Sequence, residues 1–278
     1  MSTAPDGMED EKVSGSDDRV AVLAERYSAE AEGYLQVYSP HLLPFQRELL
    51  ALVDLTRAAR ILDLGGGPGT AIPFIHAASP SALVVAADRA IGMIALAPSD
   101  SPRVALDAMD LPFADGSFDA VFMAFMAFHL PDPQAGFTEA ARVLAAGGSL
   151  AIATWGADET IGDAWVVWDE ELDRAGAPVN APVGLPDYRS LGTAEALTAL
   201  LRTAGFADIG FRMDRWTHRP SHEDFMAFMR EHVVRDRLAA LDPVRRAACV
   251  EAVTERTRGL PASDLGLDAE VLFAVATR

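Results

Sequence analysis

A glycine-rich segment behind a short apolar run is the feature that most constrains the fold of this chain. Residues 61–64 are aliphatic except for one aspartate, which is typical of a short buried strand, and residues 65–70 read Gly-Gly-Gly-Pro-Gly-Thr. Without a Cβ atom, Gly65, Gly67 and Gly69 can adopt positive φ and let the backbone approach a ligand, while free N–H groups at the start of the next helix face the same point. The segment predicts a site for a nucleotide-like cofactor. A simple glycine-rich turn between strand and helix is the alternative.

Composition limits the class of protein and its partners. With 278 residues and 50% hydrophobic content, the chain can bury a large core as one large domain or as one domain with a cap. Its formal net charge of −18 repels phosphate backbones and anionic membrane surfaces, so we expect neither nucleic acid nor a membrane as a partner.

The single cysteine and the single lysine remove several chemistries. Cys249 excludes an intramolecular disulfide and a zinc site built on several thiolates, and a reducing cytoplasm suits it best. We find no signal segment and no apolar run of membrane-spanning length. Lys12 lies in a polar tail, which argues against a phosphate-binding loop with Gly-Lys-Ser/Thr, a Schiff-base lysine and a Tyr-x-x-x-Lys pair. The preference for arginine and alanine is typical of a GC-rich bacterial gene.

Strands alternate with helices along most of the chain. After residues 61–64, apolar segments predict strands at 82–87, 104–106, 118–123, 149–154, 206–216 and 267–277. This alternation predicts a doubly wound α/β sheet of parallel strands, with ligands beyond their carboxyl ends. Asp88 ends the second strand about 20 residues after the glycines, where a carboxylate can accept both ribose hydroxyls of an adenosyl group. The alternative is that Asp88 caps the following helix.

The segments around this core suggest a division of the chain. Three of its four tyrosines, Tyr27, Tyr34 and Tyr38, lie close together near His41 and form either a flap over the cofactor or aromatic packing under a helix pair. The expected parts are a disordered acidic tail (1–18), an N-terminal helical flap (19–59), the cofactor-binding core (60–155), a lid segment (156–190), the core continued (191–216), a helical cap insertion (217–262) and a final core strand (263–278).

Taken together, the motifs resemble those of a known family. The series consists of Ile-Leu-Asp-Leu-Gly-Gly-Gly-Pro-Gly at 61–69, Asp88, Asp107-Ala108, the segment 111–121 and Arg-Val-Leu-Ala-Ala-Gly-Gly at 142–148. It is similar to the class I S-adenosylmethionine-dependent methyltransferases, most of all to the small-molecule branch that includes the ubiquinone and menaquinone biosynthesis enzymes. The resemblance implies a Rossmann-like sheet of seven strands, mostly parallel, whose last strand inserts antiparallel between the fifth and the sixth.

The resemblance also implies roles for single residues. The glycines, Gly66 included, would line the methionine portion of S-adenosylmethionine, and Asp63 would support their loop and the ammonium group. Asp88 would hold the ribose hydroxyls, and Asp107 with the backbone near Ala108 and Met109 would contact adenine. The full expected cofactor-binding set is Asp63, Gly65, Gly66, Gly67, Gly69, Asp88, Arg89, Met93, Asp107, Ala108, Met109, Met123, Tyr27 and Tyr34.

Three residues depart from the motifs of the methyltransferase and dehydrogenase families. Arg89 stands where an apolar residue often covers adenine, and Ala145 replaces the common proline before the Gly-Gly turn. Thr70 occupies the position at which a dehydrogenase uses its third glycine for close packing of helix on strand, so a nicotinamide cofactor is the weaker hypothesis.

Methyl transfer from a sulfonium needs alignment and exclusion of water, and a base only where the acceptor must lose a proton. His129, just past the fourth strand, is the best-placed candidate for that base, and the alternative is a purely structural role. His41, His218 and His222 would follow if the flap and cap close over the site. We predict no metal, because Pro220 interrupts the helix that a His218-x-x-x-His222 ligand pair would need.

The prediction is therefore a methyltransferase that acts on a small molecule, such as a natural product or a quinone-like intermediate. Its acceptor atom, whether oxygen, nitrogen or carbon, is left open. Apolar residues of the cap permit an aromatic or lipophilic acceptor or simply form the cap's own core, namely Trp165, Trp168, Trp216, Phe225, Phe228 and Met229. The alternative function is a protein that binds S-adenosylmethionine and acts as a regulator or scaffold without transfer.

Overall fold

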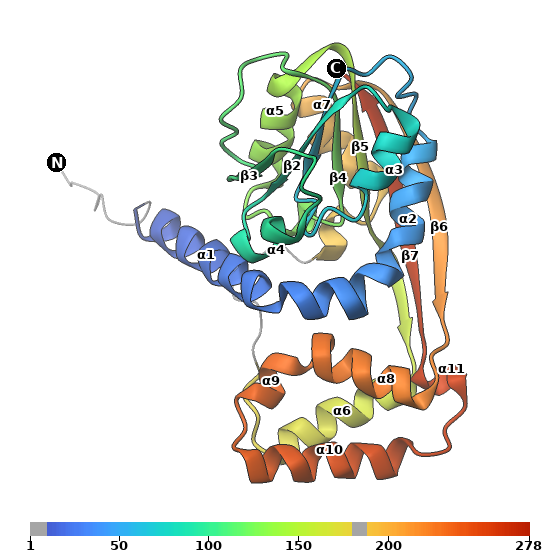
Figure 1. Ribbon diagram of the computed structural model, residues 1–278. Coiled ribbons are helices and arrows are strands. Elements are labelled where there is room, and N and C mark those ends of the chain that lie inside the picture. The colour runs from blue at the N-terminus through green and yellow to red at the C-terminus, as the bar shows by residue number, and fades with distance from the viewer. Residues whose placement is uncertain (1–9, 180–187) are drawn as a thin grey trace, which may run out of the picture.

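The computed structural model describes residues 10–179 and 188–278, and its centre is one sheet of seven strands in the order β3-β2-β1-β4-β5-β7-β6 (Figure 1). The strands are β1 (Arg60–Leu64), β2 (Leu83–Asp88), β3 (Arg103–Ala105), β4 (Phe118–Ala124), β5 (Leu144–Ile161), β6 (Ala207–His218) and β7 (Leu267–Thr277). All pairs among β1 to β5 are parallel, whereas β7 is antiparallel to both β5 and β6. The predicted sheet and the predicted place of the last strand are confirmed.

Helices cover both faces of the sheet. Helices α5 (Pro133–Val143) and α7 (Ala194–Thr203) pack together on one face, and α2 (Ser39–Ala51) and α3 (Ile72–Ala78) pack together on the other (Figure 1). Local signals set where helices begin. Asp132 and Thr193 accept hydrogen bonds from free N–H groups of the first turns of α5 and α7, at 3.2 and 3.1 Å. Short connecting segments are η2 (Ala127–His129) and η3 (Tyr188–Leu191).

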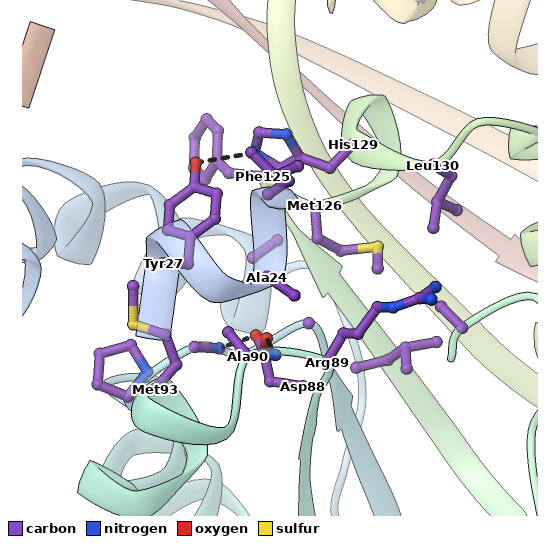
Figure 2. Close-up of a pocket in the computed structure, with 18 of the residues that line it drawn as sticks. Ala24, Tyr27, Asp88, Arg89, Ala90, Met93, Phe125, Met126, His129 and Leu130 are labelled. Carbon is purple, nitrogen blue, oxygen red and sulfur yellow. Dashed lines mark hydrogen bonds between the residues drawn. The ribbon is translucent and has the colours of Figure 1, made fainter. Parts of the chain in front are cut away.

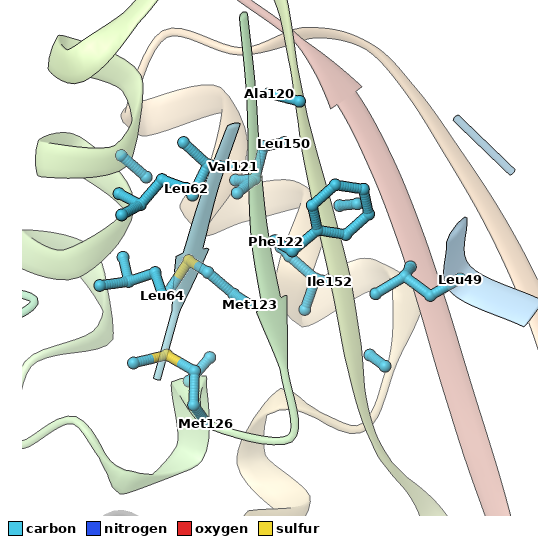
Figure 3. Packing of buried hydrophobic residues seen from close by; sticks show 14 of the residues in the cluster. Leu49, Leu62, Leu64, Ala120, Val121, Phe122, Met123, Met126, Leu150 and Ile152 are labelled. Carbon is cyan, nitrogen blue, oxygen red and sulfur yellow. The ribbon is translucent and has the colours of Figure 1, made fainter. Parts of the chain in front are cut away.

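The core of the sheet is aliphatic on both faces, as expected for parallel strands covered by helices. On β1, Ile61, Leu62 and Leu64 are buried. Leu62 and Leu64 lie with Met123 of β4 on one face, while Phe122 points to the other face, toward Leu49 of α2 (Figure 3). This alternation determines to which face of the sheet each side chain points. It thereby fixes the register of the strands, so that their ends meet at a defined edge.

Two N-terminal helices cross this edge. α1 (Asp10–Gly33) leads through a π-helical turn, η1 (Tyr34–Tyr38), into α2, and it packs along α4 (Ile91–Leu96). In Figure 1, α1 runs between the sheet and a separate group of helices below it.

That group of helices is the cap, and it has its own core. The cap consists of α6 (Asp163–Arg174), α8 (His222–Phe228), the π-helical turn η4 (Met229–Val233), α9 (Arg235–Ala239), α10 (Pro243–Thr257) and α11 (Ala262–Leu265). Trp168, Phe225 and Val253 are among the buried side chains at its centre. The strands β5, β6 and β7 extend from the sheet to reach it (Figure 1).

Several expectations about the flanking segments need correction. Residues 10–18, expected to be disordered, belong to α1, and residues 1–9 lie outside the described part of the chain. The expected fifth strand at 149–154 is longer and continues to Ile161, and α6, expected as part of a lid segment, packs into the core of the cap. The helix expected from 222 to 259 is divided into α8, η4, α9 and α10. Within the described residues, no helix is long and apolar enough to cross a membrane.

Candidate functional site

The glycine loop after β1 has the backbone that the sequence predicts. Gly65, Gly67 and Gly69 have φ of +67°, +57° and +70°, which residues with a Cβ atom rarely adopt. A Cβ atom on Gly67 would meet nothing closer than Met93 Sδ at 4.0 Å, so it would project into open space. A Cβ atom on Gly69 would lie 2.8 Å from Pro98. The loop needs glycine at 67 for its backbone and at 69 also for packing.

Asp88 at the end of β2 holds this loop. Its Oδ2 accepts a hydrogen bond from the Gly67 N–H at 2.9 Å, and its Oδ1 accepts one from the Ala90 N–H at 2.8 Å. Burial raises the pKa of the Asp88 carboxyl above its ordinary value. Each carboxylate oxygen retains a further lone pair, so the group can also accept hydrogen bonds from a ligand.

Asp63 lies beneath the loop and does not line the cavity. Its side chain is 1% exposed, and its Oδ2 has no hydrogen-bond partner among the described residues. Burial, with a smaller effect of the Asp88 charge, raises the pKa of Asp63 to about 7. A Cβ atom on Gly66 would lie 2.2 Å from Oδ2 of Asp63, so the carboxyl sits directly against the loop backbone.

Arg89 and Asp107 form an ion pair beside the loop. Arg89 Nη1 lies 2.7 Å from Asp107 Oδ2, and Asp107 Oδ1 accepts a hydrogen bond from the Met109 N–H at 2.9 Å. Both side chains are about one-third exposed, at 35% and 32%. Both oxygens of Asp107 are thus engaged, Oδ2 by Arg89 and Oδ1 by the Met109 N–H.

Helix α1 closes the opposite side of the site. Figure 2 shows Tyr27 of α1 above Asp88, with its hydroxyl directed at the ring of His129; the distance from Oη to Nε2 is 3.2 Å. Burial raises the pKa of Tyr27 and lowers the pKa of His129 to about 4, so both groups are neutral near pH 7. Tyr34 packs edge-on against Tyr27, with ring centroids 5.8 Å apart.

Contacts with the core and with the cap hold α1 in this place. The Gly92 N–H of α4 donates to Ser28 Oγ at 3.2 Å, and a Cβ atom on Gly92 would lie 2.2 Å from the Ser28 carbonyl oxygen. On the cap side, Arg26 pairs with Asp236 at 3.1 Å, and the buried Glu30 pairs with Arg235. Helix α1 is therefore fixed to both the core and the cap.

Together these elements enclose a cavity of about 980 Å³, referred to below as the cofactor cavity. Most of the predicted site residues line it, including His129; they are Gly65, Gly66, Gly67, Asp88, Arg89, Met93, Asp107, Ala108, Met109, Tyr27 and Tyr34. Gly69 and Asp63 support the loop from behind and do not line the cavity. The assignment of Met123 is not supported, because its side chain points into the core beside Leu64 (Figure 3).

Sequence analysis missed other residues that line this cavity. They are Val20, Leu23, Ala24, Ser39, Leu42, Gln46, Leu64, Pro68, Thr70, Ala90, Leu106, Ala124, Phe125, Met126, Leu130 and Pro131. The amphipathic spacing of 20–27 could have indicated that α1 covers a site. No sequence pattern indicated Phe125. Its φ of +56° is unusual for a residue with a side chain, and such strained residues are often found at functional sites.

A second cavity of about 590 Å³ lies between the sheet and the cap; we name it the aromatic chamber. It is lined by Tyr38, Phe128, Trp155, Glu159, Trp165, Trp216, Phe228, His232, Val233, Leu267 and Ala269. Trp155 and Trp216 stack with ring centroids 5.5 Å apart. The apolar cap residues thus divide, because Trp165, Trp216 and Phe228 line the chamber whereas Trp168, Phe225 and Met229 are in the core of the cap.

The remaining histidines do not gather at the cofactor cavity. His41 and His218 pack edge-on at 4.7 Å, and burial lowers the pKa of both, that of His218 to about 4. His222 bonds to Thr257 within the cap at 2.8 Å. Among residues 10–179 and 188–278, no group of three His, Cys, Asp or Glu side chains could hold a metal ion.

Comparison with known proteins agrees with this geometry. Residues 62–152, which contain the glycine loop, Asp88 and His129, match the methyltransferase domain family. The chain is 35% identical over 178 residues to the demethylmenaquinone methyltransferase of Mycolicibacterium vanbaalenii, which covers 60% of this chain and 77% of that enzyme. The chain belongs to the class I S-adenosylmethionine-dependent methyltransferases. The relative of the same name from Streptomyces avermitilis is 33% identical over 186 residues, and it too covers 60% of this methyltransferase and 77% of its own length.

Solved structures show the same fold at low identity. A methyltransferase from Thermotoga maritima has a TM-score of 0.51 and 15% identity over 91% of this methyltransferase and 98% of that chain. The partner of the Trm112 methyltransferase activator from Haloferax volcanii has a TM-score of 0.56 and 18% identity over 91% of this chain and 97% of that one.

The cofactor of the methyltransferase is S-adenosylmethionine, as the family establishes, and the site suits it. The open space beside Gly67 leaves room for a ligand against the loop backbone. The free lone pairs of Asp88, which lines the cavity, suit a cofactor that carries ribose hydroxyls, and the unpartnered Oδ2 of Asp63 lies against the loop backbone.

Proposed function

We propose that the enzyme transfers a methyl group from S-adenosylmethionine to a flat aromatic small molecule, of the quinone-like class, that binds in the aromatic chamber. The observation that carries this proposal is the chamber itself, where seven aromatic or imidazole rings surround a space next to the cofactor cavity. Aromatic walls favour planar apolar ligands, because ring faces and edges add to the free energy of burial. The demethylmenaquinone methyltransferases among its relatives make a ring-bearing acceptor consistent with descent.

The residues that lie between the two cavities support a transfer of the methyl group from one cavity to the other. Tyr34 lines the cofactor cavity and Tyr38, on the next turn of η1, lines the chamber, with ring centroids 5.2 Å apart. Phe128 lines the chamber and its neighbour His129 lines the cofactor cavity. The two cavities are thus lined by neighbouring residues of the same segments, which supports a transfer of the methyl group from one to the other.

The residues of the cofactor cavity then have the following roles. When bound, S-adenosylmethionine supplies a methyl group on a sulfonium whose departure leaves a neutral thioether. The loop at Gly65 and Gly67 would hold the methionine portion, and Asp88, which holds the loop, would accept hydrogen bonds from the ribose hydroxyls. Arg89, held by Asp107, would contact the adenine ring. Helix α1 excludes water, which helps because the substitution needs alignment in a dry site.

His129 remains a candidate for a catalytic role on the cofactor side. Its ring is neutral, and its Nε2 is engaged with the Tyr27 hydroxyl. We assign to this pair the closing of α1 over the cofactor, and we keep His129 as a candidate base whose contribution the variants below measure.

The test is a reaction with a defined acceptor. The enzyme is incubated under reducing conditions with S-adenosylmethionine and 1,4-dihydroxynaphthalene, and the product is analysed by mass spectrometry for the gain of one methyl group with formation of S-adenosylhomocysteine. Trp216→Ala should raise KM for the acceptor and leave the affinity for S-adenosylhomocysteine unchanged. Val166→Ala, at an exposed side chain of α6, is the matched surface control.

Two outcomes would speak against the proposal. Turnover of non-aromatic acceptors only, or equal KM values for the Trp216→Ala and wild-type enzymes, would show that the chamber does not bind the acceptor. Binding of S-adenosylmethionine without turnover of any acceptor would instead favour the regulator or scaffold function.

A further inference from the structure

We propose that His232, on the cap side of the chamber, recognises a hydroxyl group of the aromatic acceptor and takes its proton during methyl transfer. This inference rests on the proposed function, because it assigns to the chamber a hydroxyaromatic class of substrate. His232 would be a catalytic residue contributed by the cap, whereas the family motifs lie in the core.

The backbone places His232 beside residues that lie between the two cavities. Both π-helical turns of the described chain meet there, since η1 carries Tyr34 and Tyr38 and η4 carries His232. The His232 ring stacks on Tyr38 with centroids 3.8 Å apart and meets Tyr34, which lines the cofactor cavity, edge-on at 6.1 Å. Helices of the π type make up well under 1% of residues and often mark functional sites, so two that face each other at one place indicate selection for side-chain placement.

The polar character of His232 is not used by the fold. Among the described residues, no group donates a hydrogen bond to its ring nitrogens or accepts one from them, although the ring is partly buried. Tyr38 stacks on one face of the ring and Phe228 lies beside it. Because His232 lines the chamber, its nitrogens are available to a ligand there. By contrast, Nε2 of His129 is engaged with Tyr27 and that of His222 with Thr257.

The charges around His232 keep it neutral and able to accept a hydrogen bond. Burial lowers the pKa of His232 to about 4, and the positive charge of Arg26 acts in the same direction, as do His41 and His129 when they are protonated. Tyr34 and Tyr38 face it from η1, and Glu159 of β5 lines the same chamber. A phenolate formed in the chamber would bring a negative charge next to the ring and raise the pKa of His232, so the imidazolium becomes more stable as the proton arrives.

The proton and the electrons balance as follows. A ring nitrogen of His232 forms a bond to the proton while the acceptor O–H bond breaks and its electron pair stays on oxygen. That pair, or the same charge delocalised to the adjacent ring carbon, forms the bond to the methyl carbon, whose former bonding pair stays with the sulfur leaving group. The imidazolium then returns its proton to water. After attack through carbon, the ring proton on that carbon is lost to water and the oxygen takes a proton back, so one proton is released in total.

The first test measures recognition without turnover. Dissociation constants of 1-naphthol and of 1-methylnaphthalene, which has a similar shape but no hydroxyl, are determined by equilibrium dialysis in the presence of S-adenosylhomocysteine. We expect His232→Ala to reduce the preference for 1-naphthol on the order of ten-fold, since it removes one hydrogen bond in a dry chamber. His76→Ala is the control, because His76 lies on α3 and lines neither cavity.

The second test separates the hydrogen bond from the proton transfer. Glutamine at position 232 can accept a hydrogen bond but cannot serve as a base. His232→Gln should therefore retain much of the preference for 1-naphthol and lose kcat with 1,4-dihydroxynaphthalene by at least ten-fold, in the range of general base catalysis. Affinity for S-adenosylhomocysteine and the thermal midpoint should not change, which confirms that the variants are folded. His129→Gln is measured in parallel.

The outcomes are distinguishable. If the wild-type enzyme binds neither naphthalene derivative and turns over no aromatic acceptor, the proposed function fails, and this inference fails with it. If the wild-type enzyme binds both but His232→Ala keeps the full preference for 1-naphthol, only the role of His232 is overturned. Unchanged kcat in His232→Gln, with loss in His129→Gln, would move the base to His129.

Discussion

The charge of Asp63 makes the sharpest prediction about stability. The side chain is buried, and its pKa rises from 3.8 to about 7 on folding. The folded state then binds a proton that the unfolded state has lost. The stability that the protonated Asp63 contributes is therefore fully present below about pH 4 and is lost as the pH rises through about 7. A shift of about 3 pKa units corresponds to about 4 kcal/mol of unfolding free energy. Asp63→Asn removes this ionisation and keeps the shape of the side chain.

The measurement is urea denaturation of wild type and Asp63→Asn at about pH 5 and about pH 8 in the absence of cofactor. We expect the variant to be more stable by about 1.5–2 kcal/mol at the lower pH, where the unfolded carboxyl has already lost most of its proton, and by about 4 kcal/mol at the higher pH. The pH dependence of the wild type alone does not isolate the contribution of Asp63. The pKa values of His129, His218 and His232 are lowered by burial to about 4, so these groups contribute stability that grows as the pH rises from about 4 to about 6.5.

The difference between variant and wild type cancels those histidines and isolates Asp63. An advantage of the variant that is equal at both pH values would refute the argument, because a pure packing effect has no pH dependence. No difference at either pH would mean that the Asp63 carboxyl ionises without cost in the folded state.

Three further predictions follow from single contacts. Asp88→Ala should weaken binding of S-adenosylmethionine by about 1–3 kcal/mol in a calorimetric titration, because it removes the carboxylate that holds the Gly67 N–H and faces the ribose; unchanged affinity would exclude the assignment. Gly92→Ala should displace α1 from α4, because its Cβ would lie 2.2 Å from the Ser28 carbonyl oxygen, and should speed cofactor dissociation in stopped-flow measurements; an unchanged rate would show that α1 does not limit release. Phe225→Ala should cost about 3–5 kcal/mol in denaturant unfolding, because the ring is fully buried in the core of the cap; a cost below about 1 kcal/mol would mean that the cap adapts.

The sheet and the cofactor side of the site were predictable from sequence because their determinants are local. A strand ending at Asp88 and glycines with positive φ are set by residues next to one another, and parallel pairing brings strand ends to one edge. The same reasoning placed His129 at the cavity. It failed for Met123, because the alternation along β4 turns that side chain into the core, and one residue decides the face.

The aromatic chamber could not be predicted, because its lining comes from distant segments. Trp155 and Trp216 are far apart in sequence and stack only because β7 lies between their strands with a particular register. The π-helical turn that places His232 has no recognised sequence signal, and the segment read as one helix from 222 to 259. Local periodicity reports which side chains are buried, but it does not report whether they fill a core or surround a space.

The continuity of β5, β6 and β7 affects how acceptor specificity could be exchanged between enzymes of this type. β7 pairs with β5 from Ser149↔Thr277 to Ile161↔Leu267 and with β6 as far as His218↔Leu267, so the three strands run from the sheet to the base of the cap. A chimera that exchanges the chamber together with the cap would have to be joined inside these strands, because Trp155 and Trp216 lie on them. An error of one residue would turn the tryptophans of the chamber to the opposite face, so the grafting of a new cap is a problem of strand alignment.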